Sequence, residues 1–285
     1  MTLLEELTAR GLVQDATHPE ALSALLAKPG LVFYCGFDPS GPTLHAGHLL
    51  PLSMMERLRR AGHRPLGLVG GSTGMIGDPT GKSEERKLLD AEALAANFQS
   101  IRSQIQKLLP DIPVLNNADW TGMGYLEFLR DVGKHITVNY MLAKESVRAR
   151  LEDREQGISY TEFSYMLLQA WDFAYLAREK NCQLQIAGSD QWGNITCGIE
   201  LHRKMGGTQE LFGLVCPLLK TASGAKFGKT ETGTSLWLDP AKTSPYRFFQ
   251  YWLNVEDADV EPYLKLFTFL PLEEISRIVA EHDSD

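Results

Sequence analysis

Long apolar runs are absent from this sequence of 285 residues. No stretch reaches the roughly 18 consecutive apolar residues that a transmembrane helix requires. The amphipathic, partly acidic N-terminus MTLLEELTARGLV resembles neither a signal peptide nor a transit peptide. Cysteine is scarce too: the four cysteines form no C-x-x-C pair and lie in apolar segments, which indicates buried free thiols. These absences favour a cytoplasmic protein that does not bind membranes.

An excess of basic residues is also missing. Lys and Arg number 28 against 36 Asp and Glu, which gives a formal net charge of −8. Such a balance argues against a chain that coats nucleic acid non-specifically, although a local basic patch stays compatible with it. Hydrophobic residues make up 44% and charged residues 22%, a mixture typical of a folded globular protein with a buried core.

Apolar and turn patterns predict an α/β fold. The run LVFYCGFDP (31–39) reads as a buried strand, LLPLSMMERLRRAGH (49–63) as a helix, and RPLGLVGG (64–71) as a second strand. A strand, a helix and a strand in this order form a βαβ unit, which implies a parallel sheet. Pro51 is tolerated only in the first turn of its helix, so that helix should begin near Gly47.

Further elements follow along the chain. The patterns predict a helix over 84–110, a strand and turn at PVLNNADW, several helices within 123–180, a strand over 182–193 that turns into a helix, and helices again from Ser244.

The stretch GDPTGKS (77–83) nearly spells a phosphate-binding P-loop, but it is one residue too short for G-x-x-x-x-G-K-[ST]. It is therefore either a chance loop or a phosphate site of another kind. Two histidines in LHAGH (44–48) lie at a predicted helix N-terminus, where free N–H groups and the helix dipole favour an anion. Helix capping, phosphate binding and metal binding all stay open for them, and metal is the least supported because no third ligand is evident.

Two downstream loops also carry candidate groups. Lys226 and Lys229 lie in LKTASGAKFGKTETG (219–233), a loop suited to placing two ammonium groups over a polyphosphate. The alternative is a solvated turn with ordinary lysines. Asp190 follows a predicted strand in GSDQWGN (188–194), where it either accepts hydrogen bonds from a ribose or caps its helix.

A polar stripe marks one predicted helix. Tyr165, Gln169 and Asp172 project within an arc of about 60°. Their helix is otherwise so apolar that little of it is left to face solvent. The stripe is therefore either solvent-facing or the lining of a polar pocket, and we favour the pocket, in which a ligand hydroxyl or amine would satisfy these groups.

These segments, taken in order, closely resemble bacterial tyrosyl-tRNA synthetases, a family of class I aminoacyl-tRNA synthetases. LHAGH is similar to the HIGH signature of the class with Ala in place of Ile, and KFGKT is similar to its KMSKS signature. The resemblance covers essentially the whole chain, through YCGFDPS, LVGGSTGMIGDPTGKSEER, FLRDVGKH, VNYMLAKESV, TEFSYMLLQA and GSDQWGNI. It implies a Rossmann-like parallel sheet with a helical insertion.

The resemblance also implies an activity. The carboxylate of L-tyrosine attacks the α-phosphate of ATP, bound with Mg²⁺ as a substrate complex, and the tyrosyl group then passes to tRNA(Tyr). No tightly bound cofactor and no protein metal site are expected. Catalysis would rest on positioning and on stabilisation of phosphate charge.

Site residues are implied at the matching positions. The residues expected to act on the phosphates are His45, His48, Lys82, Arg86, Lys226, Lys229 and Thr230. Those expected around tyrosine are Tyr34 and Asp172 at the phenol, Asp78, Tyr165 and Gln169 at the ammonium group, and Gln191. Those expected around the rest of ATP are Cys35, Gly36, Asp38, Gly47, Gly188, Asp190, Leu218 and Leu219. Pro51 departs from the family pattern, since a hydrogen-bonding residue is common there.

The resemblance suggests a division of the chain. Residues 1–243 should form the catalytic domain, and a helical insertion at about 120–165 should make a homodimer interface, with Phe128, Val138, Tyr140 and Met141 as candidate contacts or, alternatively, as core residues. Residues 244–285 should begin a helical anticodon-binding domain whose remainder is absent. Tyrosine activation should then survive, while tRNA charging by this chain is an open question.

Two alternatives stay open at this point. Another class I nucleotidyl transferase, such as a tryptophanyl enzyme, would share the phosphate motifs, but the pair Tyr34 and Asp172 suits a phenol. A structural RNA-binding relative that assists intron folding would carry basic insertions, which this sequence lacks.

Overall fold

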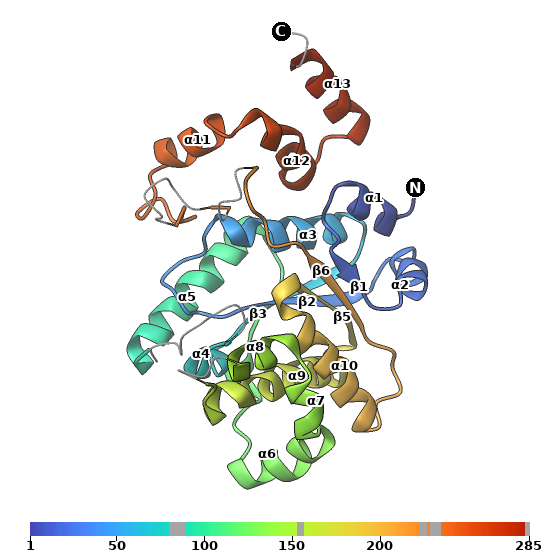
Figure 1. Ribbon diagram of the computed structural model, residues 1–285, viewed down its shortest axis with the longest axis vertical. Coiled ribbons are helices and arrows are strands. Elements are labelled where there is room, and N and C mark those ends of the chain that lie inside the picture. Colours follow the sequence, from blue (N-terminus) through green and yellow to red (C-terminus); the bar gives the residue numbers. More distant parts are fainter. Residues whose placement is uncertain (80–88, 153–156, 223–226, 229–234, 283–285) are drawn as a thin grey trace.

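A six-stranded sheet divides the molecule into two helical layers (Figure 1). The computed structural model describes residues 1–79, 89–152, 157–222, 227–228 and 235–282. The strand order is β1-β6-β5-β2-β3-β4, with every pairing parallel except that of β1 with β6. The strands are β1 (Asp15–Ala16), β2 (Val32–Phe37), β3 (Arg64–Val69), β4 (Val114–Asn116), β5 (Cys182–Gly188) and β6 (Phe212–Cys216).

The predicted parallel α/β sheet is confirmed, with two additions. The sequence patterns indicated β2, β3, β4 and β5, but not β6 or the two-residue β1. Strand β1 is too short to show any periodicity in the sequence. Its antiparallel pairing with β6 makes the sheet mixed rather than purely parallel.

One helical layer covers one face of the sheet. It consists of α1 (Leu3–Ala9), α2 (Pro19–Leu26), α3 (Leu49–Arg60) and α5 (Ala91–Leu108). The short 3-10 turn η1 (Ala46–His48) leads directly into α3, so Pro51 lies in the first turn as predicted. Helix α5 begins at Ala91, because the Asp90 side chain caps it by accepting a hydrogen bond from the Ala93 N–H (2.7 Å). Residues 84–88 of the predicted helix lie outside the described residues.

The other layer is built on two long helices, α9 (Tyr160–Lys180) and α10 (Trp192–Lys204). They approach closely at Gly198, where a Cβ would lie only 3.0 Å from Phe173. From residue 120 to the start of α9, the described residues form four shorter elements: α6 (Tyr125–Asp131), η3 (Gly133–His135), α7 (Val138–Leu142) and α8 (Glu145–Glu152). The remaining short elements are α4 (Thr73–Ile76), η2 (Asn117–Asp119) and η4 (Ser189–Gln191).

Alternation along β2 assigns its side chains to the two layers. Phe33, Cys35 and Phe37 pack in the core beneath α3 and α5, whereas Tyr34 packs on the opposite face, against α9. Tyr34 is thereby placed on the face that carries the polar stripe of α9.

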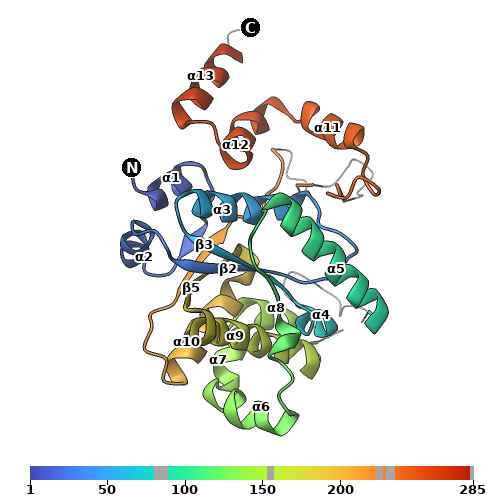
Figure 2. The same ribbon diagram turned by 180° about the vertical axis from the view of Figure 1, so that it is seen from behind.

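The chain ends in three helices that lie over the α3 layer, as seen from both sides (Figures 1 and 2). They are α11 (Pro245–Leu253), α12 (Asp257–Phe267) and α13 (Leu272–His282), and they confirm the predicted helical tail. Within the described ranges no helix is long and apolar enough to cross a membrane.

The helices of residues 120–165 bear one correction. Val138 is 58% exposed, but Met141 is only 2% exposed and packs against the apolar cluster of α9 and α10. Met141 is therefore a core residue of the single chain and not a candidate interface contact.

A buried ion pair ties these short helices to α9. Arg150 on α8 donates two hydrogen bonds to the Glu162 carboxylate (3.0 and 2.9 Å) and two to the Gly157 carbonyl (3.1 and 2.9 Å). Both side chains are almost fully buried, at 5% and 2% exposure. The ion pair thus fixes the first turn of α9, which precedes the turns that carry Tyr165 and Asp172.

Arg150→Ala should lower the free energy of unfolding by about 3–5 kcal/mol, because it leaves a buried carboxylate unpaired. Urea unfolding followed by circular dichroism measures this loss. The matched control is Arg148→Ala, whose guanidinium is 65% exposed and lies 3.7 Å from Glu152. That control should change stability by no more than about 1 kcal/mol. Equal losses in the two variants would contradict the role assigned to Arg150.

Candidate active site

The candidate groups gather at the carboxyl ends of the parallel strands. Strand β2 lies in the middle of the sheet, with β3 on one side and β5 on the other. The chain runs outward from β2 in both directions, so the sheet has a topological switch point beside this strand. Ligands of open α/β sheets bind at such points.

Asp38, which follows β2, links two layers of the site. Its Oδ1 accepts a hydrogen bond from the Thr73 hydroxyl (2.8 Å), and its Oδ2 accepts one from the Tyr165 hydroxyl on α9 (2.7 Å). Gly70 leaves the room for this arrangement, since a Cβ there would lie 2.1 Å from Thr73 Oγ1 and 2.3 Å from Asp38 Oδ1. Any side chain at position 70 would break the network.

Asp172 is a buried carboxylate held by two neutral donors. Asn117 Nδ2 donates to its Oδ2 (3.0 Å), and the Trp120 indole N–H donates to its Oδ1 (2.8 Å). Burial raises the pKa of this carboxyl to about 7, and the Asp38 charge adds to the rise, whereas the two hydrogen bonds lower it. The group is therefore poised between its neutral and charged forms near neutral pH.

Tyr34 lies in the same interior and has an unsatisfied hydroxyl. Its side chain is 1% exposed, and its hydroxyl oxygen has no hydrogen-bond partner among the described residues. Burial and the Asp172 charge raise the pKa of this phenol well above its usual value, so it stays protonated and able to donate. An unpaired buried hydroxyl is costly, and a ligand hydroxyl would satisfy it.

A second polar group surrounds Asp78. Gln191 Nε2 donates to Asp78 Oδ2 (2.6 Å), while Asn194 Nδ2 bridges Gln191 Oε1 (3.2 Å) and Gln169 Oε1 (2.9 Å). Asp78 is buried, at 7% exposure. These contacts bring Asp78, Gln169 and Gln191 together although they come from three separate segments, and Asp78 also raises the pKa of Tyr165, after burial and Asp38.

The two histidines of LHAGH cap the turn that begins α3. Gly47 N donates to His45 Nδ1 (3.1 Å), and His45 N donates to His48 Nδ1 (3.0 Å). Because both Nδ1 atoms accept, each imidazole carries its proton on Nε2. Burial lowers the pKa of His48 to about 3, and the electrostatic interaction with the neighbouring His45 lowers it further, so His48 stays neutral. The capping interpretation is thus correct, and it also leaves both rings as Nε2–H donors.

The end of β5 brings another group of the predicted residues together. At the end of β5, a Cβ on Gly188 would lie 2.7 Å from Asp190 Oδ1 and 3.3 Å from Leu218 Cδ2. Leu218 is 59% exposed, and Gly36 faces open space. The structure therefore brings Gly188, Asp190 and Leu218 together, while Leu219 packs against the core and Cys35 is buried.

Gly228, a described residue of the KFGKT sequence, lies against the histidine turn. Gly228 has a φ of +75°, and a Cβ there would lie 3.1 Å from Ala46 Cβ and 3.4 Å from Gly47 N. Beyond the loop, Leu236 accepts from Ala46 N (2.8 Å), and Trp237 forms a β-bridge with His45. Five predicted phosphate-binding residues lie outside the described residues, namely Lys82, Arg86, Lys226, Lys229 and Thr230.

Sequence reasoning missed four residues of the network: Thr73, Asn117, Trp120 and Asn194. A signal was available for two of them, because Asn117 and Trp120 follow a predicted strand in PVLNNADW and the carboxyl ends of strands carry sites. Across the part of the chain that the structure describes, no cluster of three or more His, Cys, Asp or Glu side chains could hold a metal ion.

Comparisons with known proteins agree on one family. A model of the tRNA synthetases of class I (W and Y) matches residues 27–285. The tyrosine–tRNA ligase of Roseiflexus castenholzii is 54% identical over 284 residues, which cover 97% of this chain and 66% of that protein. The tyrosine–tRNA ligase of Geobacillus stearothermophilus is 52% identical over 288 residues, which cover 99% of this chain and 68% of that protein.

A solved structure gives the same result. A C-terminally truncated mitochondrial tyrosyl-tRNA synthetase of Aspergillus nidulans superposes with a TM-score of 0.88 at 32% identity, covering all of this chain and 84% of the other. The chain spans 66% of the length of the first of these curated relatives, slightly less than two thirds.

The raised pKa of Asp172 predicts a pH effect on stability. Between the value of an unfolded Asp, about 4, and the folded value, the folded protein holds the extra proton, so unfolding becomes easier as the pH rises. The free energy of unfolding of the wild type, relative to Asp172→Asn, should fall by up to about 1.4 kcal/mol per pH unit between pH 4 and the folded pKa of about 7. Urea unfolding of both proteins from pH 4.5 to 8.5 tests this, and parallel profiles would contradict it.

Proposed function

Because this chain belongs to the tyrosyl-tRNA synthetases of class I, as its motifs indicated, we propose that it activates L-tyrosine with ATP and transfers it to tRNA(Tyr). The observation that carries the tyrosine assignment is the buried pair of Tyr34 and Asp172. Tyr34 offers a hydroxyl that has no partner among the described residues, and Asp172 offers a carboxylate. A substrate phenol inserted between them would engage both.

The phenolic hydroxyl is the only part of tyrosine that phenylalanine lacks. With phenylalanine in the pocket, the Tyr34 hydroxyl would stay unpaired, and Asp172 would be desolvated with no new donor. Each group left unpaired costs about 1–3 kcal/mol. The other end of the substrate would lie near Asp78, Tyr165 and Gln169, where the carboxylate attracts the ammonium group.

ATP would lie across the carboxyl ends of β2, β5 and β6. Asp190 would accept from the ribose hydroxyls, and Leu218 would cover the adenine. The open space at Gly36 would admit the phosphates, which would lie beside the turn that contains Gly47. His45 and His48 would each donate an Nε2–H to phosphate oxygens. Since His48 is held neutral, it would act as a donor of a hydrogen bond rather than as a charge.

The reaction needs no covalent enzyme intermediate. A tyrosine carboxylate oxygen forms a bond to the α-phosphorus, and the bond from that phosphorus to the bridging oxygen breaks, releasing pyrophosphate. Asp78 and Asp172 would hold the two ends of tyrosine, so the carboxylate is aimed at the phosphate. Mg²⁺ would enter with ATP as part of the substrate, and Lys82, Arg86, Lys226, Lys229 and Thr230 are proposed to stabilise the departing pyrophosphate.

The remaining assignments concern the whole protein. We assign residues 1–243 to the catalytic domain and 244–285 to the start of a helical anticodon-binding domain, and we place the protein in the cytoplasm. The helices of residues 120–165 would form a homodimer interface, because they expose large apolar side chains at Tyr125, Leu126, Val138 and Tyr160.

The test of the function is exchange of labelled pyrophosphate into ATP with each amino acid in turn. Tyrosine should support exchange, and phenylalanine should support it at least about 100-fold less. Exchange with tryptophan instead would favour the tryptophanyl alternative. Silence with every amino acid would favour the structural RNA-binding alternative.

Asp172→Ala tests the pocket itself. Isothermal titration should show tyrosine affinity falling by about 100-fold and ATP affinity changing by less than about twofold, since only the phenol loses its acceptor. Asp119→Ala, at an exposed position in the turn between the two donors Asn117 and Trp120, is the matched control and should bind both ligands normally. Unchanged tyrosine affinity in Asp172→Ala would remove the assignment.

Light scattering tests the dimer. The mass should be near twice 31.8 kDa. Leu126→Asp should shift it to a single chain, because a charge at the centre of an apolar interface is unpaired. Tyr246→Asp changes an equally exposed apolar residue outside residues 120–165 and should leave the mass unaltered. A wild-type monomer would contradict the proposal.

A further inference from the structure

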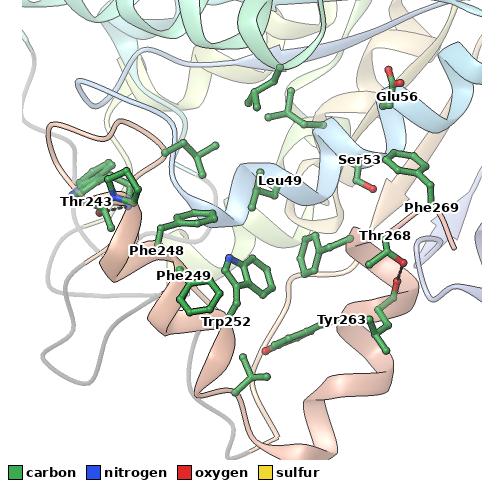
Figure 3. Close-up of a pocket in the computed structure, with 18 of the residues that line it drawn as sticks. Leu49, Ser53, Glu56, Thr243, Phe248, Phe249, Trp252, Tyr263, Thr268 and Phe269 are labelled. Carbon is green, nitrogen blue, oxygen red and sulfur yellow. Dashed lines mark hydrogen bonds between the residues drawn. The ribbon is translucent and has the colours of Figure 1, made fainter. Parts of the chain in front are cut away.

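Helix α12 bridges α3 and the segment that carries KFGKT. A large apolar cavity of about 1010 Å³ separates α3 from α11 and α12, and its lining includes Leu49, Phe248, Trp252 and Phe269 (Figure 3). Beside the cavity, Tyr263 and Leu266 of α12 belong to the same apolar core cluster as α3. Polar contacts near the two ends of α12 add to this packing.

The C-terminal end of α12 is fixed to the catalytic layer by polar side chains. Ser53 on α3 donates to the Leu266 carbonyl (2.8 Å), and Arg57 on α3 donates to the carbonyls of Lys265 (3.3 Å) and Thr268. Arg10 on α1 donates to the Leu270 carbonyl (2.9 Å). Both arginines are buried, and cations at a helix C-terminus are favoured by its dipole.

The N-terminal half of α12 holds the opposite partner. Both carboxylate oxygens of Asp259 accept from the Ala222 N–H, at 3.0 and 3.1 Å. Asp259 is only 6% exposed although it lies in the first turn of its helix. A buried carboxylate aimed at one backbone N–H fixes that peptide more firmly than a neutral acceptor would.

A second contact holds the centre of the same segment. Phe227 is 5% exposed and packs against Tyr251, Trp252, Tyr263 and Phe267, with ring centroids 5.3–6.0 Å apart. The next residue donates through its N–H to the Tyr251 hydroxyl (3.0 Å). Phe227 is thus buried among α11 and α12, although it belongs to the KFGKT sequence.

We propose that α12 is a strut that positions Phe227 and Gly228 of the KFGKT sequence against the histidine turn, and that Asp259 is the positioning residue that holds the preceding chain at Ala222. The inference rests on the proposed function, because its effect on rate requires that Lys226 and Lys229 act on ATP. Phe227 and Gly228 are the described residues between these lysines, and Gly228 lies against Ala46 and Gly47. Helix α3 follows that turn and carries Arg57, which donates to the Lys265 carbonyl of α12. The histidine turn and Gly228 are therefore both connected to α12.

The test compares Asp259→Ala with Asp257→Ala, an 89% exposed carboxylate on the same helix. In tyrosine-dependent pyrophosphate exchange, Asp259→Ala should lower kcat by about tenfold, while the dissociation constant for tyrosine stays within about twofold, because the tyrosine site does not touch α12. Asp259→Asn keeps one acceptor oxygen, so its kcat should lie between those of the wild type and Asp259→Ala. Asp257→Ala should behave as the wild type.

A readout without activity separates this inference from the proposed function. Trypsin cleavage within residues 220–229, followed by mass spectrometry, should be about tenfold faster in Asp259→Ala than in the wild type and in Asp257→Ala. Wild-type cleavage and wild-type kcat in Asp259→Ala would overturn the inference. If the wild type shows no exchange but Asp259→Ala is still cleaved faster than the wild type, the strut is supported and the proposed function is contradicted. If Asp259→Ala does not fold, Asp259→Asn carries the same comparison.

Discussion

The Asp172 carboxylate lies in the protein interior with neutral donors on both oxygens, and much of the site depends on how those donors are held. Asn117 donates to Asp172 and also to the Thr73 hydroxyl, which in turn donates to Asp38. The side-chain oxygen Oδ1 of Asn117 accepts from the Ser72 N–H. The ends of β2, β3 and β4 are therefore joined to α9 through one amide side chain, and this connection offsets the cost of burying the carboxylate.

The sequence was informative wherever the chemistry is local. The glycine, proline and histidine pattern around LHAGH located the helix start correctly, and the spacing of Tyr165, Gln169 and Asp172 placed them on one face of α9. Asn117 and Trp120 escaped notice because their partner Asp172 is 55 and 52 residues away, and nothing in a single sequence pairs them. The strand β6 was missed because a buried five-residue run has no alternation to detect.

The same limit applies to the last three helices. Their existence was evident from periodicity, but their contacts were not. Phe227 reads as part of a polar loop, yet its ring is buried among aromatic side chains that follow it by 24 to 40 residues. Likewise, no local pattern in the sequence marks Arg10 and Arg57, and only the fold shows that both donate to carbonyls near the end of α12. Side chains that join distant segments are the part of a site that local patterns cannot supply.

The two-residue strand β1 protects an edge of the sheet. Asp15 pairs with Val215 and Ala16 with Leu214, and the Thr17 hydroxyl accepts from the Gly213 N–H (2.9 Å). Every residue of β6 is buried and largely apolar, so an uncovered β6 would offer a row of open amide and carbonyl groups on a hydrophobic strand. Such an edge recruits strands from neighbouring molecules. The few residues that precede α2 thus keep a crowded solution of this protein from assembling edge to edge.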